Sequence, residues 1–261
     1  MSLEQKKFLN KIKKEKMLVK LIQILIIILF FGIWEVLARY NMINTFIFSS
    51  PKRIIDTIIV LQTQNNLLTH IFTTLKEIII AFILGIVLGF FIAVLLYSFK
   101  LLAKVLEPFL TMLNSLPKVA LGPMLIIWCG ANTKSIIVMA LLINLIINII
   151  TIYNGFLATD EIKIRILQTF GASKIQILSN VIIPNSYITI ISSLKLNISM
   201  SLIGVIMGEF LVSKAGIGYL IIYGTQVFNL NLVMSGIFIL IIISYLLYKV
   251  IVKIEERVLT K

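Results

Sequence analysis

The segment LATDEIKIRILQTFGASKIQILSNVIIPNSYITI, residues 157–190, is the one long amphipathic stretch between two strongly apolar ones. It predicts a helix capped by Thr159, because the acidic Asp160 and Glu161 then suit the exposed N–H groups of the first turn. The helix is expected to end at Gly171, since glycine readily adopts the left-handed backbone that closes many helices.

A second helix is predicted to begin at Ser173. Gln176 follows three residues later, and this spacing lets each side chain satisfy a free backbone N–H group of the other residue. Pro184 is expected to bound the helix, because the residue before a proline is driven out of the helical region. Its apolar and polar residues divide between two faces: Ile175, Leu178 and Ile182 on one, and Lys174, Gln176 and Asn180 mainly on the other. The pattern fits a short cytoplasmic hairpin that docks into another protein, or an ordinary loop resting on lipid headgroups.

Two short motifs favour the docking hairpin. Phe170-Gly171-Ala172-Ser173, followed by Val181-Ile182-Ile183-Pro184, resembles the cytoplasmic loop of binding-protein-dependent permeases of ATP-driven importers. In that family the loop is named for a Glu-Ala-Ala triplet, followed by a glycine and an aliphatic-x-aliphatic-proline ending. Arg165-Ile166-Leu167 replaces the triplet here, so the packing of the loop is expected to differ at this point.

Two further stretches resemble the same family. The proline-bearing run that ends in Trp128-Cys129-Gly130 resembles a core helix that typically ends in Trp-Phe-Gly, with Cys129 in place of phenylalanine. Residues 216–221, GIGYLI, match a Gly-Leu-Gly-Tyr-Leu-Ile stretch of the nitrate, sulfonate and taurine branch. Taken alone, the two glycines of this stretch do not make a phosphate-binding loop, because the third glycine and the Lys-Ser/Thr pair are missing.

The composition indicates a membrane protein. Of 261 residues, 59% are hydrophobic and only 13% are charged, which is more apolar surface than a soluble domain of this length could bury. Since a span needs about 20 apolar residues, the sequence predicts an all-α polytopic membrane protein of about six transmembrane helices with a cytoplasmic coupling-helix hairpin. The net charge of +13 is attributed to cytoplasmic loops and not to nucleic-acid binding. A single cysteine and a single histidine exclude an internal disulfide and a Cys- or His-rich metal site.

The chain is expected to divide into five parts. They are a basic cytoplasmic amphipathic arm (1–20), a first transmembrane helix (21–38), an external connection (39–72), a permease core (73–252) with the coupling loop (157–187), and a cytoplasmic tail (253–261). A cleaved secretory signal is the alternative for the first helix. Most of the 24 lysines and arginines then fall on one side, which predicts cytoplasmic termini, a cytoplasmic hairpin and a multi-pass location in the cell membrane of a bacterium.

Polar residues and prolines inside the apolar segments are the candidates for a translocation path. Pro117 lies in a segment with three prolines, and broken helices often line the substrate route of a transporter. Asn144 and Asn148 share one helix face, where they could either line a path or bond to neighbouring helices. The fifth span adds Asn197, Ser201 and Glu209. An acid at this depth is a functional candidate by default, although a salt bridge from Glu209 to Lys214 remains open.

No nucleotide-binding or catalytic constellation is visible, so the chain is not expected to be an enzyme or to bind a cofactor or metal itself. The resemblance implies an importer permease that works with cytoplasmic ABC ATPase subunits carrying ATP and Mg, an extracytoplasmic solute-binding protein and a second permease copy. It assigns the coupling role to Gly171, Ala172, Ser173, Lys174, Ile175, Gln176, Leu178 and Pro184. It favours a sulfonate, organic anion or vitamin precursor as solute. A stand-alone channel or ion-coupled carrier, or a membrane scaffold, remains the alternative.

Overall fold

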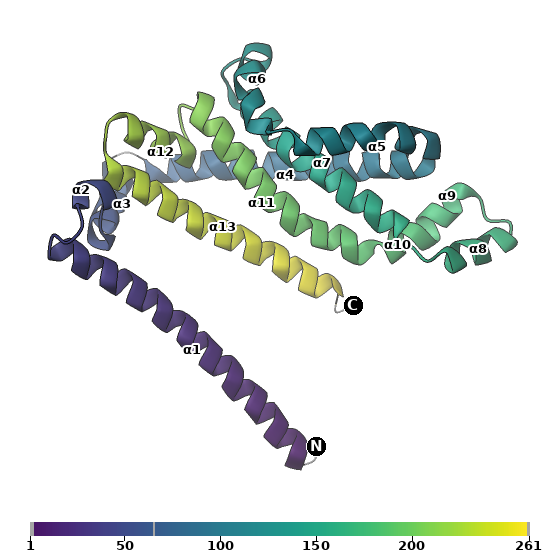
Figure 1. The fold of residues 1–261 in the computed structure, drawn as a ribbon, viewed down its shortest axis with the longest axis horizontal. Coiled ribbons are helices and arrows are strands. Elements are labelled where there is room, and N and C mark those ends of the chain that lie inside the picture. The colour runs from purple at the N-terminus through teal and green to yellow at the C-terminus, as the bar shows by residue number, and fades with distance from the viewer. Residues whose placement is uncertain (1–2, 65, 260–261) are drawn as a thin grey trace. The chain divides into compact units, whose positions relative to one another are not determined.

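The computed structural model describes residues 3–64 and 66–259, and all regular structure in these ranges is helical (Figure 1). The two outermost residues at each end, including Lys261 of the predicted tail, lie outside the described residues, as do the side chains of Lys6 and Lys7 in the predicted arm. Five described helices are long and apolar enough to cross a membrane, or six if one bent pair counts as a span. The prediction of an all-α polytopic membrane protein is confirmed.

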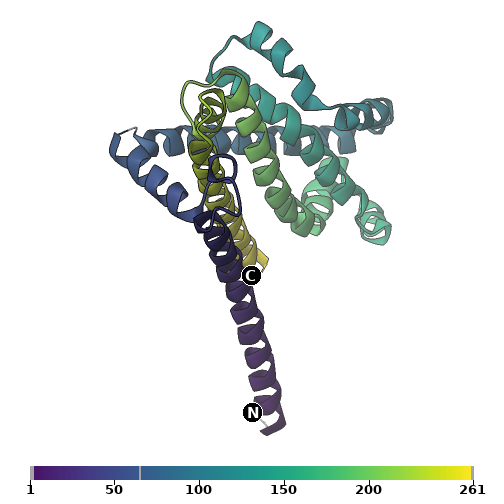
Figure 2. The ribbon, with the colours of Figure 1, turned by 60° about the vertical axis from the view of Figure 1, so that its left-hand side comes forward.

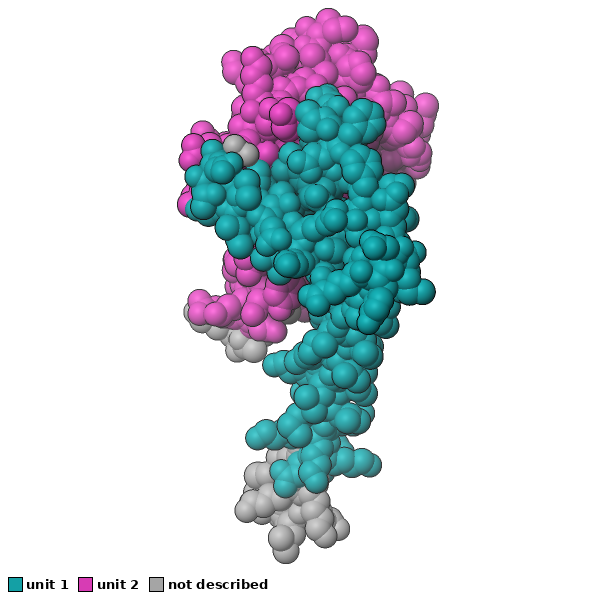
Figure 3. Space-filling view, turned by 90° about the vertical axis from the view of Figure 1, so that its left-hand side faces the viewer, with its two compact units in different colours: residues 1–65, 224–235 teal, residues 66–223, 236–261 magenta. Residues whose placement is uncertain are grey.

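The chain forms two compact units, residues 1–65 with 224–235 and residues 66–223 with 236–261 (Figure 3). The first unit contains α1 (Leu3–Arg39), α2 (Thr45–Phe48) and α3 (Pro51–Gln64). Figure 2 shows α1 as one uninterrupted rod. The predicted boundary between a basic arm and a first span at Lys20 is therefore not a break in the helix.

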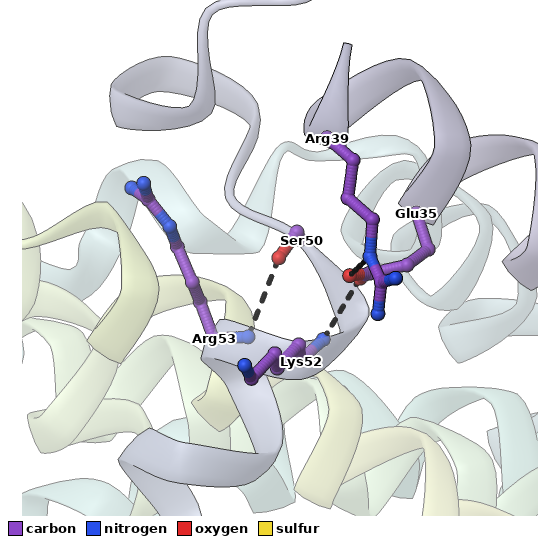
Figure 4. Close-up of polar contacts among 5 residues, drawn as sticks. All are labelled: Glu35, Arg39, Ser50, Lys52 and Arg53. Atoms are coloured by element: carbon purple, nitrogen blue, oxygen red, sulfur yellow. Dashed lines mark hydrogen bonds and ion pairs between the residues drawn. The ribbon is translucent and has the colours of Figure 1, made fainter. Parts of the chain in front are cut away.

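A polar cluster fastens the end of α1 to the start of α3 (Figure 4). One Glu35 carboxylate oxygen accepts a hydrogen bond from Arg39 Nε at 3.0 Å, and the other accepts from the backbone N–H of Lys52 at 3.1 Å. Ser50 accepts from the backbone N–H of Arg53 at 3.3 Å. Since the first N–H groups of a helix have no partner within it, Glu35 and Ser50 together cap α3.

The second unit is built on α4 (Leu67–Ser98), α7 (Thr133–Leu157) and α11 (Tyr187–Val212), with α12 (Ile217–Gln226) and α13 (Leu230–Leu259) each running in both units. α4 begins earlier than the predicted Thr73. In Figure 1, α7 lies beside both α4 and α11, and these are its main packing partners. The ion pair between Lys195 and Glu255 joins α11 to α13.

Small residues allow α7 to approach its two neighbours closely. A side chain added at Gly89 on α4 would meet Asn148 of α7 at 2.3 Å, and one added at Gly204 on α11 would meet the backbone of Ala140 at 2.4 Å. Gly85 and Gly89 therefore lie on a packing face of α4.

The third apolar segment, residues 100–129, contains three prolines and is not one continuous helix. α5 (Lys100–Ser115) and α6 (Gly122–Cys129), with a 3₁₀ turn at Lys118–Leu121, form a pair bent by 88°. Pro108 lies inside α5 without ending it, and Pro123 lies in the first turn of α6, where its missing N–H costs little. Pro117 stands between the helices, so it is the proline that accompanies the break.

Candidate functional site

The predicted hairpin is formed by α8 (Glu161–Thr169), α9 (Lys174–Ile177), a π turn η2 (Leu178–Ile182) and α10 (Ile183–Asn185). It extends past the ends of α7 and α11 (Figure 1). α8 is capped by Asp160, whose carboxylate accepts from the N–H of Ile162 at 2.8 Å. The prediction that Thr159 is the cap is wrong, because Thr159 lies one residue too early and is buried.

The turn between the two hairpin helices has the predicted geometry. Gly171 has a φ of +77°, and the N–H of Ala172 bonds back to the carbonyl of Leu167 at 3.1 Å. The capping box is present, since the backbone N–H of Ser173 donates to the Gln176 side chain at 2.8 Å and the N–H of Gln176 donates to the Ser173 hydroxyl at 3.3 Å. Both predictions are confirmed.

The second hairpin helix does not end before Pro184. It passes through the π turn and continues to Asn185, so the prediction that Pro184 bounds the helix is wrong. A proline ring clashes with the carbonyl four residues before it in a regular α-helix, and the wider π turn relieves this crowding. Asn185 accepts a hydrogen bond from Lys163 at 2.8 Å, which ties the end of this helix to α8.

The π turn also changes which residues face inward. Ile177 and Ile182 are buried, and they pack with Ala93, Ile152 and Phe156 in one apolar cluster. Because a π turn pairs positions five residues apart, these two isoleucines lie above one another, which a 3.6-residue period does not anticipate. The predicted shared face is thus wrong in part: Leu178 is half-buried against this cluster, whereas Ile175 is 77% exposed.

The tip of the hairpin presents apolar side chains to the surroundings. Phe170 is 84% exposed, and Lys174 and Gln176 are exposed beside Ile175. We call these four residues the hairpin tip. The stretch that replaces the Glu-Ala-Ala triplet keeps a packed role, since Leu167 contacts the apolar cluster and Arg165 pairs with Glu161 at 3.0 Å.

The hairpin is anchored at its base. The Ser186 hydroxyl donates to the carbonyl of Gly155 at 2.8 Å, and a side chain added at Gly155 would meet Thr189 at 2.8 Å. α7 and α11 are therefore in direct contact where the hairpin leaves and rejoins them. A groove of about 490 Å³ lies between α8 and the second hairpin helix, lined in part by Lys163, Asn180 and Pro184.

Most of the predicted path residues are buried in the core of the second unit. Asn144 donates to the carbonyl of Ala81 at 3.1 Å and to the Ser201 hydroxyl at 2.7 Å, and Ser201 donates to Asn197 at 3.2 Å. Asn148 donates to the carbonyl of Gly85 at 2.8 Å. All four predicted residues are buried, which favours the interhelical alternative over a path. Pro117 is not part of this network and is exposed at the break between α5 and α6.

Glu209 is enclosed by partners that sequence reasoning missed. Its carboxylate accepts from the Thr74 hydroxyl at 2.6 Å and from the backbone N–H of Gly218 at 2.5 Å. No ion pair joins it to Lys214 in the described part of the chain. A side chain added at Gly216, whose φ is +120°, would lie 2.4 Å from the Glu209 carboxyl carbon. The sequence feature that could have predicted this enclosure is the pair Gly216 and Gly218, which follows shortly after the acid of the fifth span.

Several transport permease proteins align with most of this chain. It is 31% identical to a probable ABC transporter permease protein of Haemophilus influenzae, over 83% of this chain and 87% of the relative. It is 28% identical to the formylaminopyrimidine transport permease protein ThiX of Halalkalibacterium halodurans, over 87% and 90%. It is 25% identical to the putative aliphatic sulfonates transport permease protein SsuC of Bacillus subtilis, over 87% and 83%.

A solved structure shares the fold. A chain of the inward-facing MetNI methionine ABC transporter aligns with a TM-score of 0.65 at 20% identity, over 74% of this chain and 95% of that one. The fold of this chain is thus that of a known transporter chain. Residues 85–260 match the family described as binding-protein-dependent transport system inner membrane component, so this chain belongs to that family and is the permease subunit of an ATP-driven importer.

Proposed function

We propose that the hairpin tip docks into a cytoplasmic ABC ATPase and passes the movement of that partner to the transmembrane helices. The observation that carries the proposal is the exposure of Phe170 and Ile175, which at 84% and 77% are the two most exposed large apolar side chains of the hairpin. A partner that covers them gains hydrophobic free energy, and the neighbouring Lys174 and Gln176 can form the polar rim of the contact. The chain itself binds no nucleotide in this scheme; the ATPase carries ATP and Mg.

The anchored base suits a lever. A displacement of the second hairpin helix moves Ile177 and Ile182, which press on Phe156 at the end of α7. The same helix continues past Pro184 to Asn185, and the hydroxyl of the next residue, Ser186, donates to the carbonyl of Gly155. Force applied at the tip therefore reaches α7 and α11 together, because close-packed interiors deform little.

We further propose that two copies of the permease enclose the path and receive solute from an extracytoplasmic binding protein. Both termini and the hairpin then lie in the cytoplasm, as the distribution of lysine and arginine favours. The broken third segment, with its exposed Pro117, is the candidate path wall. The buried amides hold the helices of each copy together. The names of the relatives favour a small sulfonate or a vitamin precursor as solute.

Single substitutions at the tip test the docking. Ile175→Asp places a charge in the proposed contact, and we expect loss of solute-stimulated ATPase activity and loss of co-purification of a P-loop ATPase, with the permease still in the membrane. Leu178→Asp is less suitable, because Leu178 also packs against the hairpin's own cluster. Ile162→Asp is the matched control, since Ile162 is exposed on α8 outside the tip. Co-purification of the ATPase with the Ile175→Asp variant in undiminished amount would contradict the proposal.

A further inference from the structure

Two buried carboxyl groups face each other in the second unit. Glu77 of α4 is 2% exposed, and Glu209 of α11 is fully enclosed. Thr74 and Glu77 are one turn apart on α4, and the Thr74 hydroxyl lies 2.6 Å from Glu209 Oε1, so the two carboxyl groups are close neighbours. Two enclosed negative charges this close would repel each other strongly. The pair therefore needs a neutralising partner.

No cationic side chain supplies it in the described part of the chain. Lys214 forms no ion pair with Glu209, and Lys76, next to Glu77 in sequence, is exposed. His70 Nδ1 accepts a hydrogen bond from the N–H of Gly216 at 3.1 Å, so this nitrogen carries no proton and the ring is neutral. The described residues also bring no third acidic, histidine or cysteine ligand to the pair. A proton is the remaining neutralising group.

The hydrogen bonds determine which carboxyl carries the proton. The Thr74 hydroxyl accepts from the N–H of Ile217 at 2.8 Å, so its single hydrogen is free to go to Glu209 Oε1. Gly218 N–H donates to Glu209 Oε2. Both Glu209 oxygens thus accept, as in a carboxylate. Glu77 Oε2 is buried, and no group donates a hydrogen bond to it. This is unfavourable for an ionised oxygen but not for a protonated carboxyl, which itself donates.

We propose that Glu77 and Glu209 form a proton-binding site within the membrane. In this site Glu77 carries the proton and donates a hydrogen bond to the Glu209 carboxylate. The site also secures the loop between α11 and α12. Glu209 holds the N–H of Gly218 directly, and Thr74 holds that of Ile217. The lack of side chains at Gly216 and Gly218 leaves the room that the carboxylate occupies. The proposal is independent of ATPase docking.

Infrared spectroscopy tests where the proton lies. The purified full-length protein in lipid at neutral pH is expected to show the carbonyl stretch of a protonated carboxylic acid. This band should disappear in Glu77→Gln and persist in Glu107→Gln, the control, because Glu107 is exposed on α5. A band that survives in Glu77→Gln, or that is absent from the unmodified protein, would overturn the assignment.

The two glutamates are also expected to differ in their response to the same substitution. Glu77→Gln keeps a donor toward Glu209 and should leave Tm unchanged. Glu209→Gln replaces one of the two accepting oxygens with an NH₂ group, so either Thr74 or Gly218 loses its acceptor, and Tm should fall by roughly 5 °C. Equal effects of the two substitutions would contradict the placement of the proton. Docking of the hairpin tip, measured by co-purification of the ATPase, should be unaffected by Glu77→Gln.

Discussion

The hairpin and the α11–α12 loop each turn on a glycine with positive φ, yet the two glycines are needed for different reasons. A side chain added at Gly171 would meet nothing within 4 Å, so only its backbone angle of +77° favours glycine. A side chain at Gly216 would overlap the enclosed Glu209 carboxylate. One turn faces open surroundings in which a partner can dock, and the other is filled by the chain's own buried acid.

The largest effect is expected from Gly216→Ala. The substitution combines a strained backbone with overlap at the Glu209 carboxyl, and should cost about 3–5 kcal/mol, lowering Tm by roughly 10 °C. Thermal unfolding of the full-length protein in lipid measures this. Gly32→Ala is the control, because nothing lies within 4 Å of an added side chain there. Equal Tm values for the two variants would remove the distinction between the turns.

Gly171→Ala should be milder. Alanine can occupy the open space, so the cost is the backbone term alone, about 1 kcal/mol, or roughly 3 °C in Tm. Gly171→Asn should recover part of the loss, because asparagine tolerates the left-handed region better than alanine. A loss as large as that of Gly216→Ala would mean that the hairpin turn is crowded as well.

Ser173→Ala is expected to have the smallest effect of the three. It removes one half of the capping box and leaves the turn intact, at a cost of about 0.5–1 kcal/mol. The change should appear as faster amide hydrogen exchange confined to residues 173–177, with little change in global Tm. Uniformly faster exchange through α7 and α11 would show that the hairpin supports the membrane helices, contrary to its role as an appended lever.

Local patterns predicted the local features well. The glycine turn and the capping box at Ser173 and Gln176 were readable, because each depends on residues a few positions apart. The inward face of the second hairpin helix was not readable. A π turn before Pro184 moved Ile177 and Ile182 to the inside, and a period of 3.6 residues cannot anticipate a turn of a different width.

The sequence alone determined that this chain crosses a membrane several times and exposes one amphipathic hairpin, because hydrophobic runs and turn residues act over short distances. Only the tertiary structure decided the partners of its buried polar groups. Thr74 and Glu209 are 135 positions apart, and Asn144 meets Ser201 57 positions away. Helix packing chooses such partners, because a polar group enclosed among helices must bond to whichever neighbour close packing brings to it.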